Sequence, residues 1–239
     1  MTEVFDLQGH WRRLWLRAPG FEDAQTAVHW LQCGEVYADI RLPADSPDCT
    51  GATALADLPD PVLLQLAAAE GFAGTIAVGH DVCTWDRRIN WHGQPETVDA
   101  GLLEWDADGR LIETGVHADY AELWERTTGP SEAMHLRATG IEAFLVTVGE
   151  NFVFGAGRPG APRASAALDL LRVGKRTSEL TLFFDLPFVL GRWQGQAGVV
   201  LSATNPLLNG TRIITNGDGV TWHKTGFLGD TADIALTPV

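Results

Sequence analysis

Short strand-like segments separated by turn signals recur along this chain of 239 residues. The segments are rich in β-branched and aromatic residues or alternate apolar with polar positions, and Gly, Pro, Asp and Asn lie between them. This pattern is typical of an all-β antiparallel protein with short connections. The predicted strands are residues 11–17, 27–34, 35–42, 75–78, 84–91, 100–106, 110–116, 135–139, 143–148, 152–155, 179–186, 188–193, 198–204, 211–215, 220–224 and 232–236.

One segment predicts a helix, and two others are ambiguous. Residues 60–71 begin with Asp60 as a cap and Pro61 at the first helical position, and they end in glycine, so we expect one short helix in the first half. Residues 165–173 suit a helix as well as a strand. The segment 120–126 also allows both, and a strand would place on one face Tyr120, Glu122, Trp124 and Arg126.

Charge and turn residues divide the chain into two halves. Residues 1–120 hold 7 Lys or Arg against 20 Asp or Glu, whereas residues 121–239 hold 10 against 11. The best linker, residues 127–131, lies beside this change. Each half has enough strands for a small barrel. We therefore expect two packed lipocalin-like (calycin-type) antiparallel barrels, the first over residues 1–129 and the second over residues 130–239.

The composition argues against several classes of partner. A formal charge of −14 disfavours nucleic acid and anionic membrane surfaces, because both need clustered Lys and Arg. No apolar run approaches the ~20 residues of a membrane helix, and the start of the chain lacks a signal-peptide pattern. Three cysteines without metal-ligand spacing are expected to be free thiols. These features predict a soluble cytoplasmic protein without a cofactor or a bound metal.

Two resemblances support the paired barrels. Gly9-His10-Trp11 resembles the G-x-W opening of lipocalin-like barrels, which implies that Trp11 packs across the barrel base under a late-strand arginine, here Arg126. The chain also resembles the poorly characterised Hri-type family of fungal and bacterial proteins, which look like paired lipocalin-like barrels. No catalytic motif accompanies that family, so the resemblance implies a fold and no activity. The matching stretches are residues 71–75, 113–116, 122–124, 191–193 and 215–217, followed by Trp222.

Aromatic and charged residues alternate over residues 84–91. On a regular strand one face carries Trp85, Arg87, Ile89 and Trp91, which suits the wall of a small polar pocket. If that face points inward, Arg87 is a cation among aromatic rings, and its buried charge needs a partner. An anionic ligand is one candidate partner; the structural alternatives are Asp39 and Glu104.

The segment 35–42 has one polar and one apolar face. The simpler interpretation is a strand with the core on one side and water on the other. The alternative places Tyr37 and Arg41 in a polar barrel lumen as ligand donors, together with Trp124. Apolar residues alternate along residues 180–186, and the continuing residues 186–193 are apolar on both faces. This stretch is either a core strand or, as we expect, an interface between the two halves.

Reactive side chains cluster most closely at residues 117–120. His117 is a candidate general base if Asp119 or Glu113 orients its ring, with Tyr120 as the acid. The seven histidines show no metal-binding spacing, although haem ligation through a single histidine, His92 or His117, remains a minor alternative. No nucleophile motif or phosphate-binding loop is present.

Three functions therefore stay open. The first is non-enzymatic binding of a small amphipathic or anionic ligand in the first barrel, and the nine tryptophans suit the walls of such a cavity. The second is a cofactor-free hydrolase or isomerase that uses His117 and Tyr120, although an enzyme is the less favoured expectation. The third is a scaffold for protein partners. Candidate ligand-binding residues are Tyr37, Arg41, Trp85, Arg87, Trp91 and Trp124.

Overall fold

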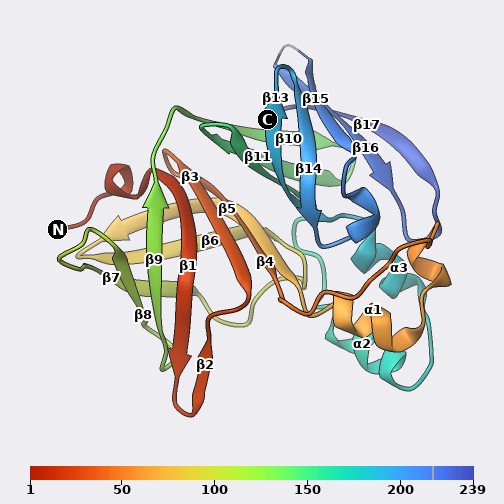
Figure 1. Ribbon diagram of the computed structural model, residues 1–239, viewed down its shortest axis with the longest axis horizontal. Helices are drawn as coiled ribbons and strands as arrows, with labels where there is room; N and C mark the ends of the chain where they lie inside the picture. The colour runs from red at the N-terminus through yellow and green to blue at the C-terminus, as the bar shows by residue number, and fades with distance from the viewer. Residues whose placement is uncertain (217) are drawn as a thin grey trace.

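The computed structural model describes residues 1–216 and 218–239, which form two closed antiparallel β-barrels lying side by side (Figure 1). Gly217, which belongs to the family-like stretch 215–217, lies outside the described residues. Pairing of β1 with β9 closes the first barrel, and the short strand β2 (Phe21–Asp23) extends β1 beyond it. The strands of this barrel are β1 (Gly9–Ala18), β3 (Ala27–Cys33), β4 (Val36–Leu42), β5 (Glu70–Gly79), β6 (Val82–Asn90), β7 (Asp99–Trp105), β8 (Leu111–Gly115) and β9 (Ala121–Thr127).

Pairing of β10 with β17 closes the second barrel. Its strands follow one another around the barrel in chain order. They are β10 (Ser131–Ala138), β11 (Ile141–Val148), β12 (Asn151–Gly157), β13 (Phe188–Gln194), β14 (Ala197–Ala203), β15 (Arg212–Asn216), β16 (Gly219–Thr225) and β17 (Thr231–Pro238). The predicted all-β fold of two barrels is therefore confirmed.

Three short α-helices gather at one end of the molecule (Figure 1). The predicted helix in the first half is α1 (Asp60–Leu66), and the ambiguous segment 165–173 forms α2 (Ser165–Arg172). The strand predicted over residues 179–186 is wrong, because that segment forms α3 (Ser178–Phe184). None of the helices in residues 1–216 and 218–239 has the length and apolar character needed to cross a bilayer. Three 3₁₀ turns complete the elements: Val4–Leu7, Leu55–Asp57 and Pro206–Leu208.

The error over α3 has a simple cause. Leu180, Phe183 and Phe184 are buried, at the i, i+3 and i+4 spacing of one helix face. The same short run also satisfies an alternation of period two, so periodicity alone does not separate helix from strand. The expected role at the interface between the halves is nevertheless met, since these three residues belong to the apolar cluster between the barrels.

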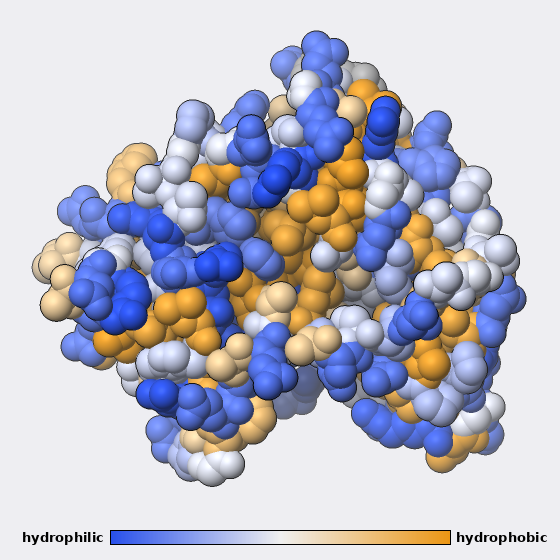
Figure 2. Space-filling model, viewed as in Figure 1, coloured by the Kyte–Doolittle hydropathy of each residue, from blue (hydrophilic) through white to orange (hydrophobic). Residues whose placement is uncertain are grey.

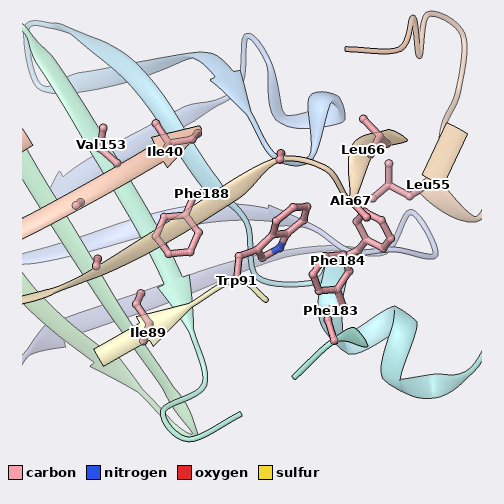
Figure 3. Packing of buried hydrophobic residues seen from close by; sticks show 14 of the residues in the cluster. Ile40, Leu55, Leu66, Ala67, Ile89, Trp91, Val153, Phe183, Phe184 and Phe188 are labelled. Atoms are coloured by element: carbon pink, nitrogen blue, oxygen red, sulfur yellow. The ribbon is translucent and has the colours of Figure 1, made fainter. Parts of the chain in front are cut away.

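The buried apolar residues form three clusters. One fills part of the first barrel around Trp11 and Trp30, and another fills the second barrel around Phe154. The third lies between the barrels and joins the outer face of β4 to β11, β12 and the three helices (Figure 3). The outer face of the first barrel is therefore apolar where the second barrel covers it.

Phe188 makes a close contact between the two barrels. The ring lies against Gly155 on the neighbouring strand and against Gly71 of the first barrel. A Cβ atom on Gly71 would lie 2.3 Å from Phe188 Cγ, and one on Gly155 would lie 2.1 Å from Phe188 Cε1. Two glycines from different barrels thus leave the space that one fully buried aromatic ring occupies.

We predict that Phe188→Ala lowers the free energy of unfolding by about 3–5 kcal/mol, because the cavity opens between two barrels whose glycines cannot fill it. Urea denaturation followed by circular dichroism measures the change. The control is Leu201→Ala on β14, where the side chain is 47% exposed and a change within about 0.5 kcal/mol is expected. Equal losses for the two variants would contradict the packing described.

Candidate functional site

The polar face of β4 lies inside the first barrel. Tyr37 and Asp39 are buried in the lumen, and Arg41 reaches the same cavity. Their neighbours Ala38 and Ile40 point outward into the apolar cluster between the barrels. Of the two interpretations of this strand, the lumen interpretation describes the structure. The interpretation with the polar face in water is wrong. The apolar face of β4 packs against the second barrel, and the polar face points into the lumen of the first.

A β-bulge divides the side chains of β6 between two environments. Ala73 pairs with Ile89 and Thr75 pairs with Asp86, so the single residue Gly74 faces two residues of β6. A Cβ atom on Gly74 would lie 1.9 Å from the Asp86 carbonyl oxygen, which leaves glycine as the residue that fits. The alternation of side chains is therefore shifted in the middle of the strand.

The bulge separates residues that were predicted to share one face. Trp85 and Arg87 line the lumen, whereas Ile89 and Trp91 lie in the cluster between the barrels. Trp91 stacks on Phe183 of α3 with 4.3 Å between ring centroids. The placement of Trp91 in the first-barrel pocket is wrong, because an unbroken period of two was assumed across the bulge.

Three arginines in the lumen are paired with carboxylates. Arg87 Nη2 lies 2.6 Å from Asp99 Oδ2, and its guanidinium carbon lies 3.6 Å from the centroid of the Phe72 ring. The partner of Arg87 is thus neither of the expected residues Asp39 and Glu104. Asp99 lies in a polar segment immediately before the predicted strand 100–106, and nothing in the sequence indicated that it would pair with Arg87.

The other two pairs use the carboxylates of Asp39 and Glu122. Arg41 Nε lies 3.0 Å from Asp39 Oδ1, and Arg13 Nη1 lies 2.7 Å from Glu122 Oε1. Arg13 also bridges to Asp23 at 2.6 Å. Burial raises the pKa of Asp39 to about 6 although Arg41 opposes that shift. Glu122 was not predicted, but it shares a strand face with the predicted Trp124 two residues later.

Glu113 and Glu122 are direct cross-strand partners on β8 and β9. Two carboxylates at this spacing repel each other. Burial, followed by the charges of Glu122 and Asp99, holds the pKa of Glu113 well above its usual value. Tyr120 donates a hydrogen bond from its hydroxyl to Glu113 Oε1 over 2.9 Å. Ionisation of Glu113 in the folded protein is therefore disfavoured.

A cavity of about 200 Å³ remains among these side chains. The ion pairs, Glu113 and Tyr120 form its polar wall. Two buried donors, Trp124 Nε1 and the Tyr37 hydroxyl, have no hydrogen-bond partner among the described residues. Buried polar groups in native proteins are normally paired with protein, water or ligand. The aromatic wall consists of Trp30, Phe72, Trp85 and Trp124.

The proposed catalytic pair is not assembled. His117 is exposed on the turn between β8 and β9, whereas Tyr120 points into the lumen and is bonded to Glu113. Burial, followed by the neighbouring Glu113, raises the pKa of Tyr120, which makes the hydroxyl a weaker acid. Within the described part of the chain, no three His, Cys, Asp or Glu side chains converge as metal ligands.

Arg126 packs on Trp11 in the first barrel, as the G-x-W resemblance implies. Trp11 is fully buried, and its Nε1 donates to the Leu7 carbonyl oxygen over 2.7 Å. The guanidinium carbon of Arg126 lies 5.1 Å from the centroid of the Trp11 ring. Gly9 has φ +143°, and a Cβ atom there would lie 2.9 Å from Arg126 Cγ. The glycine, the tryptophan and the arginine thus form one packed unit.

Comparison with known proteins supports the fold alone. No known protein family and no curated protein matches the sequence. Among solved structures, the chain is similar to the uncharacterized protein YLR301w from Saccharomyces cerevisiae, with a TM-score of 0.57 and 9% sequence identity. The match covers 97% of each chain, so it includes both barrels.

We predict that Arg13→Met lowers the free energy of unfolding by about 3–5 kcal/mol, because Glu122 would lose its closest cation in a buried site. The matched control is Arg12→Met on the outer face of the same strand, where the Arg12–Glu125 pair is 58% and 37% exposed and a loss below about 1 kcal/mol is expected. Urea denaturation of both variants provides the comparison. A small effect at both positions would refute a tightly paired lumen.

Glu113→Gln tests the protonation of the lumen. Because the folded-state pKa of Glu113 is raised above its unfolded value, wild-type stability from this group is lost as the pH rises through the folded pKa. Glutamine keeps an acceptor for Tyr120 and cannot ionise, so the variant should become increasingly more stable than wild type as the pH rises above about 4.5, where this carboxyl group ionises in the unfolded chain. Unfolding midpoints measured across this range are decisive.

The exposed Glu104 on β7 provides the control. Glu104→Gln should change the free energy of unfolding by less than about 0.5 kcal/mol at each pH, since the side chain is exposed. If Glu113→Gln also followed wild type at every pH, Glu113 would be ionised in the folded protein.

Proposed function

We propose that the first barrel is a binding protein for a small planar molecule that is uncharged or basic. The observation that carries this proposal is the lumen cavity, which has aromatic walls, the buried carboxyl group of Glu113 with its raised pKa, and Trp124, whose Nε1 is unpartnered among the described residues. A few oriented polar groups in an otherwise aromatic cavity are typical of ligand sites.

The volume limits the ligand to one ring with a small substituent. Ligand pockets in proteins commonly measure about 300–1,000 Å³, so a cavity of about 200 Å³ is small. A cavity of about 150 Å³ in another protein holds benzene. A long acyl chain is therefore a poor fit to the lumen.

The charges favour an uncharged or basic ligand over an anionic one. Arg41 and Arg87 line the cavity, but each already has a carboxylate partner within 3.0 Å. Four carboxyl groups line the same space: Asp39, Asp99, Glu113 and Glu122. An anion would have to displace one of the carboxylates from its arginine and leave that buried charge unpaired, which costs several kcal/mol.

Membership of the Hri-type family of lipocalin-like proteins is part of the same proposal. The Gly9–Trp11–Arg126 unit and the two-barrel architecture support it. Under this proposal the protein acts in the cytoplasm without a cofactor or a metal, does not bind nucleic acid or membranes, and has no catalytic role for His117. A protein partner is compatible with it, because the lumen site leaves the outer surfaces unused.

Three ligands of one shape test the charge requirement. We expect benzamide and benzamidine to bind, and benzoate to bind at least about tenfold more weakly because of the lumen carboxylates. Proton–nitrogen correlation spectra of the nine indole N–H groups report binding at each tryptophan separately. Tight binding of benzoate, or binding of none of the three, would defeat the proposal.

Trp124→Phe locates the site. The substitution keeps the ring and removes the N–H, so benzamide should lose about fivefold in affinity while benzamidine, which carries no carbonyl oxygen, is unaffected. Trp15→Phe on β1, outside the lumen lining, is the control and should leave both affinities unchanged.

A further inference from the structure

A second pocket, of about 240 Å³, lies between the barrels. Its floor is formed by the end of β6, the end of β12, α2 and α3, and the loop that follows β12 covers one side. Leu182, Phe183 and Leu186 provide an apolar wall, opposite small residues such as Ala161 and Ala167. Apolar surface is concentrated along the boundary between the barrels in the view of Figure 2. The lumen described above shares no lining residue with this pocket.

Trp91 brings an unsatisfied donor to the pocket. Its side chain is 93% buried, since only 7% of its surface is exposed, and Nε1 has no hydrogen-bond partner among the described residues. Figure 3 shows the indole among the rings of Phe183, Phe184 and Phe188, with Phe183 and Phe184 on its nitrogen side. Phe183 stacks on the indole with 4.3 Å between ring centroids, and Phe184 crosses it at 74°, so neither ring supplies a strong hydrogen-bond acceptor.

Two arginines lie at the rim of the pocket. Arg158 makes no ion pair in the described part of the chain, and it donates only to the Leu182 carbonyl oxygen, over 3.3 Å. Arg163 pairs with Glu96, but the two side chains are 51% and 78% exposed, so this ion pair is weak and a ligand carboxylate can replace it. Glu179 also lies in the lining. Arg158 is therefore the rim cation without a carboxylate partner among the described residues.

We propose that this pocket binds an aromatic monocarboxylate of about two fused rings. The rings continue the stack of Trp91 and Phe183, while the carboxylate lies at Arg158 and Arg163. The volume exceeds the ~150 Å³ that holds one benzene ring in another protein, so a second ring fits. Neither the lumen nor its proposed ligand is needed for this site.

The test uses 2-naphthoate and its uncharged analogue 2-naphthamide. Isothermal titration should show naphthoate binding at least about tenfold more tightly than naphthamide. The Arg158→Gln/Arg163→Gln variant should abolish that difference, whereas Arg172→Gln, an exposed arginine of α2 outside the pocket, should preserve it. Equal affinities of the wild-type protein for naphthoate and naphthamide would overturn the proposed carboxylate site. The pocket would then be an apolar site for an uncharged ligand.

Indole resonances assign the site independently. Naphthoate should move the Trp91 N–H resonance, which is identified by its absence from Trp91→Phe, and should leave that of Trp124 in place. Ala161→Trp, on the loop that covers the pocket, should remove binding of both naphthalene ligands without affecting benzamide binding in the lumen. Persistent naphthoate binding to the Ala161→Trp protein, confirmed as folded by circular dichroism, would refute the site.

Discussion

The arginine–carboxylate pairs inside the first barrel set the conditions for the rest of its structure. Buried charges are tolerated only when paired with good geometry, and Arg13, Arg41 and Arg87 each have a carboxylate within 3.0 Å. Three positive charges face the three carboxylates of Asp39, Asp99 and Glu122. The fourth lumen carboxyl, Glu113, has no arginine of its own, and burial raises its pKa. The three arginines thereby balance three of the lumen carboxylates, although the first half of the chain carries most of the negative charge.

A polar interior changes what the outer surface must do. A barrel usually gains stability by filling its inside with apolar side chains, and part of this interior holds ions and a cavity instead. Ala38, Ile40 and Ile89 carry the apolar face of their strands outward, where the second barrel and the helices bury them. The second barrel, which has an apolar core of its own, therefore contributes to the stability of the first. The fit of Phe188 over Gly71 and Gly155 indicates how closely the two barrels are matched.

Much of this arrangement was predictable from the sequence, and its limits have specific physical causes. Alternation and turn residues predicted the strands and the paired barrels, and the Gly9–Trp11 pattern predicted the position of Arg126. Tyr37, Arg41, Trp85, Arg87 and Trp124 do lie in one lumen or along its wall. Trp91 does not, because the β-bulge opposite Gly74 shifts the side-chain alternation of β6. The sequence of β6 itself alternates as a regular strand would, so it did not reveal the bulge. The partner of Arg87 could not be predicted either. The register of the neighbouring strands decides which of the many acidic residues lies beside Arg87, and the sequence does not fix that register.

That bulge also explains how one strand serves two environments. Before it, β6 directs Trp85 and Arg87 into a charged lumen; beyond it, the chain directs Ile89 and Trp91 into an apolar contact. A regular strand would put all four residues on one face. Either Arg87 would then lie in the apolar contact between the barrels, or Trp91 would lie in the charged lumen. Since Gly74 admits no side chain opposite the bulge, the register of β6 against β5 is held at this point. The polar pocket and the apolar pocket therefore have fixed positions relative to each other along a single strand.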